Sequence, residues 1–410
     1  MAQQALGIVQ TGSKLNVALL SKSYKQFVLK SIETYDLETD RSDLDSRKDE
    51  ILQKLKVFST VNKIGNARLS LGLNRSDYLW SIVEMPPVSS EDVRQILGFE
   101  LESHLPVDQD KVAYDACLMD SVAGVTSRVA LAACDTKLVD HGQAIAAQSG
   151  LDLDAITTTT YSVVNVINGH WKPVTDSKHS VFLLCGEDGY EVVVTSEGKH
   201  VASRIVEFSS PWHISNGPDR DTEITDEDIT GIILQNIQLT LLMANLSSGL
   251  DSIEELTCLG RCDEMVLKEM KDRLPATVFS AVAIENLLDQ NTSYDQIAAI
   301  CLAMEQLGDG ECLNLLPPDL RPVRRDIGKI LISVGAGVLA AGMVLVGANN
   351  FWQTDLALAA TNARIASLET KVNQITDINQ RFSATQDAKS FFLSRSADYP
   401  SHLEVLMEVT

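Results

Sequence analysis

The feature that most constrains this chain is a stretch of 19 residues without a charge, at positions 330–348. As an α-helix it would be about 28 Å long, which is close to the hydrocarbon thickness of a bilayer. A buried core helix is the alternative, but core helices are usually shorter and amphipathic, whereas this stretch is apolar on every face. The sequence therefore predicts one transmembrane helix over residues 330–348.

Basic residues gather just before this stretch. Arg321, Arg324, Arg325 and Lys329 precede it, and the next basic residue after it is Arg364. The positive-inside rule then predicts a single-pass protein whose N-terminus is cytoplasmic.

One face of the predicted crossing carries small residues four positions apart: Ser333, Gly337 and Ala341. Such a row lets a second helix approach closely, so it indicates packing in the membrane, most simply as a homodimer. Small residues are also common in crossings that do not pair, and this alternative stays open.

Heptad spacing follows the crossing, over residues 350–397. Apolar residues recur every seven positions in two series, one through Ile365 and Val372 and the other through Leu368 and Ile375. The polar Asn379 continues the first of these series. The spacing predicts a coiled coil, although a single amphipathic helix lying on a domain would show a similar stripe. The seam residues are Ile365, Leu368, Val372, Ile375 and Phe382. Residues 398–410 are expected to begin a further module that this chain does not contain.

The charge of the chain is concentrated before the membrane. The net charge is −22, and residues 1–320 alone carry −23. A nucleic-acid-binding protein needs Lys and Arg to neutralise phosphates, so we expect no nucleic acid among the partners. The seven cysteines are an odd number without a regular framework, and none follows Cys312, which favours a reduced compartment.

Strand-like and helix-like segments alternate through residues 1–310. Short apolar runs such as 15–20 and 180–185 alternate with stretches of helical periodicity such as 91–105. No long linker separates them. The pattern predicts a cytoplasmic α/β domain of two halves, distinct from a simple doubly wound sheet.

Several segments resemble a known family. Residues 6–17 (LGIVQTGSKLNV) look like the opening hairpin of actin-like pilus-assembly proteins of the PilM class. Residues 90–106, with Tyr114-Asp115, are similar to that family's helix and following strand. Residues 311–321 (ECLNLLPPDLR) look like the N-terminal motif of PilN. The chain resembles a PilM/PilN-type fusion of the type IV pilus machinery, or the related type II secretion L protein. The resemblance implies an actin-like, two-lobed cytoplasmic domain.

The resemblance also implies a docking function for residues 311–329. This range contains the motif of residues 311–321 and the basic residues that precede the crossing, which are called the basic collar below. In the family, an Asn-Leu-Leu-Pro segment docks into a groove on the actin-like protein. The matching residues here are Leu313, Asn314, Leu315, Leu316 and Pro317. Because the motif is tethered to its expected receptor, docking within the same chain or on a neighbouring copy would need little intrinsic affinity. An ordinary juxtamembrane linker is the alternative.

The residues that would bind nucleotide in the family are replaced. Val9 stands where an Asp is expected, Thr11 where a Gly is expected, and Asn16 where a basic residue is expected. Leu184 replaces a second Asp, and Gly260-Arg261 matches a Gly-Gly pair. Without carboxylates, Mg²⁺ lacks oxygen ligands and water lacks positioning groups. We therefore expect no catalytic residues, cofactor or metal; the alternative is an actin-like ATPase that hydrolyses ATP during assembly.

Other candidate chemistry is weaker. Cys258 and Cys262 could ligate a metal but lack a matching second pair, and His104 and His213 are isolated. By resemblance, the expected function is a non-catalytic inner-membrane assembly platform of a type IV pilus or type II secretion machine. The expected partners are a PilO-like or secretion M-like single-pass membrane protein and a cytoplasmic hexameric secretion ATPase.

Overall fold

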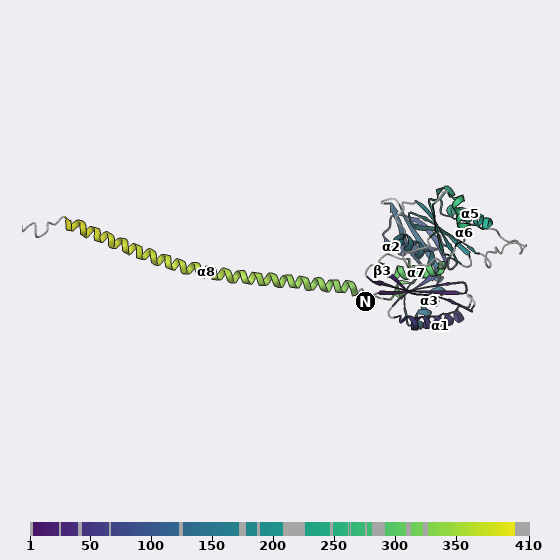
Figure 1. The fold of residues 1–410 in the computed structure, drawn as a ribbon, viewed down its shortest axis with the longest axis horizontal. Helices are drawn as coiled ribbons and strands as arrows, with labels where there is room; N and C mark the ends of the chain where they lie inside the picture. Colours follow the sequence, from purple (N-terminus) through teal and green to yellow (C-terminus); the bar gives the residue numbers. More distant parts are fainter. Residues whose placement is uncertain are drawn as a thin grey trace, which may run out of the picture. The chain divides into compact units, whose positions relative to one another are not determined.

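The chain forms two compact units, Met1–Val323 and Arg324–Thr410 (Figure 1). The computed structural model describes residues 3–397 except 24–25, 40–42, 65–66, 123–125, 172–177, 187–188, 208–225, 247–248, 261, 263, 275–276, 281–291, 309–312 and 323–326. Residues 398–410, His213, Arg261, Cys312, Arg324 and Arg325 therefore lie outside the described residues.

The first lobe is built on a five-stranded sheet of order β3-β2-β1-β4-β8. Its strands are β1 (Gln3–Thr11), β2 (Lys14–Ser23), β3 (Gln26–Asp36), β4 (Arg68–Leu73) and β8 (Asp152–Thr158). Helices α1 (Leu44–Asn62) and α3 (Thr136–Ser149) lie on one face of this sheet (Figure 1). The strand β8 pairs only with β4 within the sheet, so it is an edge strand.

The second lobe repeats this topology. Its sheet has the order β11-β10-β9-β12-β13, in which the first three strands are antiparallel and the next pairings are parallel, as in the first lobe. Its elements are β9 (His179–Cys185), β10 (Gly189–Ser196), β11 (Lys199–Glu207), α5 (Asp226–Met243), β12 (Glu255–Gly260), α6 (Glu264–Arg273) and β13 (Thr277–Ser280). The two α/β halves expected from the sequence are present.

A buried helical layer joins the lobes. Helix α7 (Tyr294–Leu307) has no exposed residue, and α4 (Thr159–Val166) packs beside it. Alternate residues of β1 explain the arrangement, because Leu6 and Ile8 face the α1 and α3 side while Val9 faces α7. Gly7 is required here, since a Cβ at this position would collide with the Ala299 carbonyl oxygen of α7.

A small sheet is inserted into the first lobe between β4 and α3. Its strands are β5 (Tyr78–Met85), β6 (Val112–Val122) and β7 (Thr126–Asp135), in the order β5-β7-β6, and α2 (Ser90–His104) covers one face. Helix α2 begins after Ser89, whose side chain accepts a hydrogen bond from the Asp92 amide and so caps the helix. Strand β6 carries Asp115 toward the first lobe.

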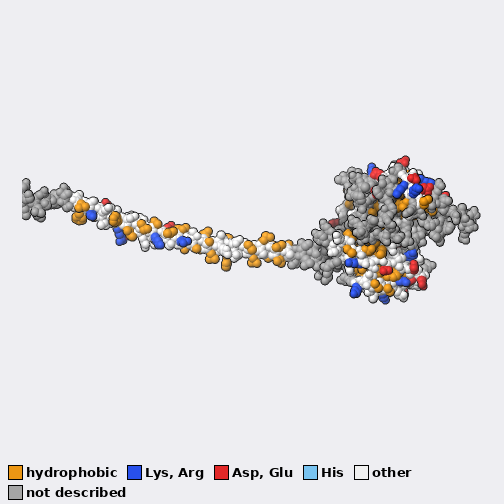
Figure 2. Space-filling view, in the orientation of Figure 1, with side chains coloured by type: hydrophobic (Ala, Val, Ile, Leu, Met, Phe, Trp, Pro, Cys, Tyr) orange, Lys and Arg blue, Asp and Glu red, His pale blue; other side chains and the backbone are white. Residues whose placement is uncertain are grey.

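The described part of the second unit is one helix, α8 (Ile327–Ala397), which is 71 residues long. Among the described residues it is the one helix long and apolar enough to cross a membrane. The hydrophobic side chains of its residues 335–395 are exposed (Figure 2). The predicted crossing and the predicted coiled coil are thus parts of one continuous helix.

Candidate functional site

The leucines of the predicted docking motif lie in the hydrophobic core of the first lobe. Leu313, Leu315 and Leu316 are 0% exposed and pack in one cluster with residues of β1, β2, α1, α3 and β8. Pro317 is half-buried and precedes the short turn Pro318–Leu320, so the chain leaves the core there. Burial of three leucines anchors this segment, since each contributes roughly 1.5–3 kcal/mol.

Asn314 joins the segment to the edge strand β8. Its side-chain oxygen accepts from the Ile156 amide (3.1 Å), and its side-chain nitrogen donates to the Asp154 carbonyl (2.9 Å). The Leu315 amide donates to the Ile156 carbonyl (2.7 Å). The Asn314 oxygen also accepts from the Leu316 amide (3.0 Å). The segment therefore makes hydrogen bonds to backbone groups at the edge of the sheet that would otherwise bond to water.

A charged cluster holds the segment from the side of the small sheet. The Asp115 carboxylate accepts a hydrogen bond from the backbone amide of Asn314 (2.8 Å). Its oxygens also lie 3.7 Å from a nitrogen of Arg94 and 3.7 Å from a nitrogen of Arg321. Arg321 also donates to the carbonyls of Leu316 (2.8 Å) and Asn314 (2.7 Å). Burial raises the pKa of Asp115, while the Asn314 amide and the two guanidinium groups oppose this rise.

The cluster of Arg94, Asp115 and Arg321 was not among the expected site residues. Each lies in a segment that carries the family resemblance, so this resemblance was the available signal. Arg94, Asp115 and Arg321 lie in three separate segments, so their spacing in the sequence does not indicate that they contact one another.

The positions that the family resemblance assigns to nucleotide binding are filled by apolar packing. Val9 is 0% exposed and Leu184 is 1% exposed, and both belong to the buried cluster around α7. The Thr11 hydroxyl donates to Asp295 at the start of α7 (2.8 Å). Gly260 has a φ of +89°, and a Cβ there would collide with the Cys185 carbonyl oxygen. A magnesium ion would find no oxygen ligand at the side chains of Val9 and Leu184.

Three cysteines meet where β9 and β12 end. The Cys262 thiol is hydrogen-bonded to the thiols of Cys185 and Cys258, and burial together with these contacts raises the pKa of both partners well above that of a free thiol. Thiols in this state are poor nucleophiles. No group of three or more His, Cys, Asp or Glu side chains suited to a metal occurs in the described part of the chain. His104 lies 3.6 Å from Glu100 on the surface of α2.

The membrane-helix and seam residues all lie on α8. Gly337 and Ala341 are exposed, and the side chain of Ser333 lies outside the described set. The seam residues Ile365, Leu368, Val372, Ile375 and Phe382 are between 48% and 65% exposed. Pairing of this helix with another remains a prediction.

No protein-family model matches the chain, and no curated protein matches it. Among solved structures, the chain is similar to a PilM-PilN type IV pilus biogenesis complex, with 14% identity and a TM-score of 0.58 over 74% of this chain and 98% of that one. It is also similar to the cytoplasmic domain of EpsL, an inner-membrane component of the type II secretion system of Vibrio cholerae (13% identity, TM-score 0.41, 78% of this chain and 100% of that one). A Bacteroides thetaiotaomicron protein with an actin-like ATPase fold gives 11% identity and a TM-score of 0.40 over 73% and 96% of the two chains.

At such low identity the similarity shows the fold and no more. The repeated five-stranded topology of the two lobes and the match to the PilM-PilN structure agree. The chain therefore has the actin-like, two-lobed α/β fold that its sequence resemblance implied.

Proposed function

We propose that this protein is a non-catalytic assembly platform of a bacterial inner membrane, in a type IV pilus or type II secretion machine. The observation that carries the proposal is the segment 313–317, whose leucines lie in the core and whose Asn314 bonds to the edge of the first sheet. This segment connects an actin-like unit to the helix that is able to cross a membrane.

The segment is proposed to act as a docking motif held in cis. In this proposal residues 1–310 form the receptor, residues 311–329 the motif and basic collar, residues 330–348 the crossing, and residues 350–397 a periplasmic coiled coil. Asp115 extends the receptor, because it contacts Asn314 and Arg321, and Arg94 lies against Asp115 from α2. Docking in cis would fix the actin-like unit at the membrane.

The apolar residues of the central layer favour a scaffold over an enzyme. Val9 and Leu184 occupy buried positions where catalysis would require carboxylates. The proposed partners are those whose binding needs only surfaces: a second copy, a PilO-like or secretion M-like single-pass protein along α8, and a hexameric secretion ATPase in the cytoplasm.

The docking proposal is tested with Leu315→Asp and Leu316→Asp. A buried carboxylate is strongly disfavoured, so the segment should leave the core and become accessible to protease. The exposed Leu320 supplies a control, because Leu320→Asp should leave the segment protected. Equal cleavage of all three variants and the unmodified chain would contradict docking.

The scaffold proposal is tested by titrating a fluorescent ATP analogue with Mg²⁺ into the full chain in detergent. No saturable binding up to millimolar concentration is expected. Tight, Mg²⁺-dependent binding followed by phosphate release would instead favour the actin-like ATPase.

Photocrosslinking from Ile365 in native membranes would identify the chain that lies against α8.

A further inference from the structure

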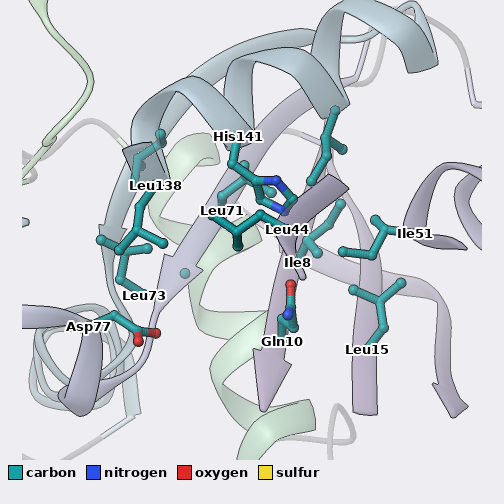
Figure 3. Close-up of a pocket in the computed structure, with 14 residues that line it drawn as sticks. Ile8, Gln10, Leu15, Leu44, Ile51, Leu71, Leu73, Asp77, Leu138 and His141 are labelled. Atoms are coloured by element: carbon teal, nitrogen blue, oxygen red, sulfur yellow. The ribbon is translucent and has the colours of Figure 1, made fainter. Parts of the chain in front are cut away.

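A cavity of about 130 Å³, partly open to solvent, lies in the first lobe between its sheet and helices α1 and α3 (Figure 3). Leu44 comes from α1, Leu71 from β4 and Leu138 from α3, so aliphatic side chains from both layers form its walls. This is close to the volume of an engineered cavity, about 150 Å³, that binds benzene. A single aromatic ring therefore fits the space.

His141 gives the cavity a polar group without a partner. Its imidazole points from α3 into the cavity (Figure 3), and its Nε2 atom is buried with no hydrogen bond. Burial, followed by the nearby charge of Lys48, lowers the pKa of His141, so the ring is neutral at pH 7. A neutral imidazole offers one donor and one acceptor, and a hydroxyl group can pair with either nitrogen.

The remaining polar groups limit the charge of a ligand. Asp77 and Gln10 line the cavity from the ends of η1 (Arg75–Asp77) and β1. The Asp77 carboxylate would repel an anion, and the aliphatic walls that form most of the lining would disfavour burial of a cation. An uncharged molecule is therefore favoured.

We propose that this cavity binds a small uncharged molecule, the size of one aromatic ring and carrying one hydroxyl group, with the hydroxyl on His141 Nε2. The site goes beyond the scaffold function and does not depend on it. One structural link exists nonetheless: Ile156 lines the cavity, and its backbone holds Asn314 and Leu315 of the docking segment.

The test uses fluorine NMR on the full chain in detergent, with 4-fluorophenol as the probe and 4-fluorotoluene as the shape-matched control. Partitioning into detergent is measured in micelles without protein. The unmodified chain is expected to show a bound signal for both probes, with 4-fluorophenol bound about fivefold more tightly because of one hydrogen bond. His141→Phe, which keeps a ring but removes the nitrogens, should reduce the affinity for 4-fluorophenol to that for 4-fluorotoluene.

Two filling variants locate the bound probe. Leu138→Phe and Leu44→Phe each add volume at a half-buried position, so at least one should fold with an unchanged melting temperature. The folded variant should lose the bound signal of both probes. Equal affinities in the unmodified chain, a signal retained in a folded filling variant, or no signal beyond that of the micelles would each overturn the proposal.

Discussion

At the scale of single residues, Asn314 makes the docking segment specific. The leucines beside it supply burial, which any apolar side chain of similar volume would also supply. Asn314 instead matches a donor and an acceptor of β8 with one side-chain amide. Because both partners are buried or half-buried, loss of this amide would leave backbone groups unpaired.

We predict that Asn314→Ala lowers the free energy of unfolding by about 1–3 kcal/mol, the penalty of leaving a buried amide unpaired. Urea unfolding followed by circular dichroism measures this change. Asp319→Ala, at an exposed position of the same segment, is the control and should be neutral. Equal losses in the two variants would mean that the Asn314 hydrogen bonds add nothing.

The sequence singled out residues 313–317 as a motif but not the residues that contact it. Leu313–Pro317 formed a contiguous motif, whereas Asp115 lies 199 positions before Asn314. A lone Asp in a strand carries no signal about a partner so distant. Only the packing of the small sheet against the first lobe brings the two together.

At the scale of elements, the short helix α4 contacts two buried carboxyl groups. The Thr160 hydroxyl donates to Glu191 of β10 (2.8 and 3.0 Å), and Ser162 and Asn165 donate to Glu305 of α7. Burial raises the pKa of both Glu191 and Glu305 to about 7. One helix thus satisfies acids from the second lobe and from the central layer.

The raised pKa values predict that stability falls as pH rises from about 4.5 to 7. In this window the unfolded chain has lost protons that the folded chain still holds, so ionisation favours unfolding. The loss is at most about 3 kcal/mol for each carboxyl group. Glu305→Gln removes the titration and keeps both contacts, with the Gln oxygen accepting from Asn165 and its nitrogen donating to the Ser162 hydroxyl, so its unfolding free energy should vary less with pH. Urea unfolding of the unmodified chain and of Glu305→Gln at several pH values in this window would measure the difference. Identical pH profiles for the two would mean that Glu305 does not have a raised pKa in the folded chain.

The seam of α8 predicts association through this helix. Val372→Asp puts a charge into the seam and should abolish chemical crosslinking between copies or to a partner in membranes. Gln374→Asp introduces the same side chain at an exposed position off the seam and should leave crosslinking intact. If both variants crosslink like the unmodified chain, α8 associates through another face or not at all.

At the scale of the whole molecule, periodicity predicted the two α/β halves and the long apolar helix, and the family resemblance implied the actin-like arrangement. Charge-free residues located the candidate crossing, and alternating strands and helices gave the two lobes. The central position of α7 could not be read in this way, because a helix buried on all sides has no amphipathic pattern. Its position depends on β1, because Gly7 leaves room for the Ala299 carbonyl oxygen and Val9 packs in the same cluster as α7.

The boundary of the first unit gives a further prediction. A chain ending at Val323 keeps Leu313, Leu315 and Leu316 in the core and should fold cooperatively without the membrane helix. A chain ending at residue 310 would lose all three leucines and leave cavities in the first lobe, so it should melt at a markedly lower temperature or aggregate. Scanning calorimetry compares the two, and equal melting temperatures would mean that the segment does not stabilise the lobe.

The position of Arg321 also has a mechanical meaning. Its guanidinium bonds to the carbonyls of Asn314 and Leu316, so it closes a short loop at the end of the docked segment. Tension applied to α8 would act on this loop before it acts on the leucines, because Arg321 lies between them and α8 in the sequence. Arg321 would therefore yield first under load, and the leucine anchor would release the actin-like unit only at higher force.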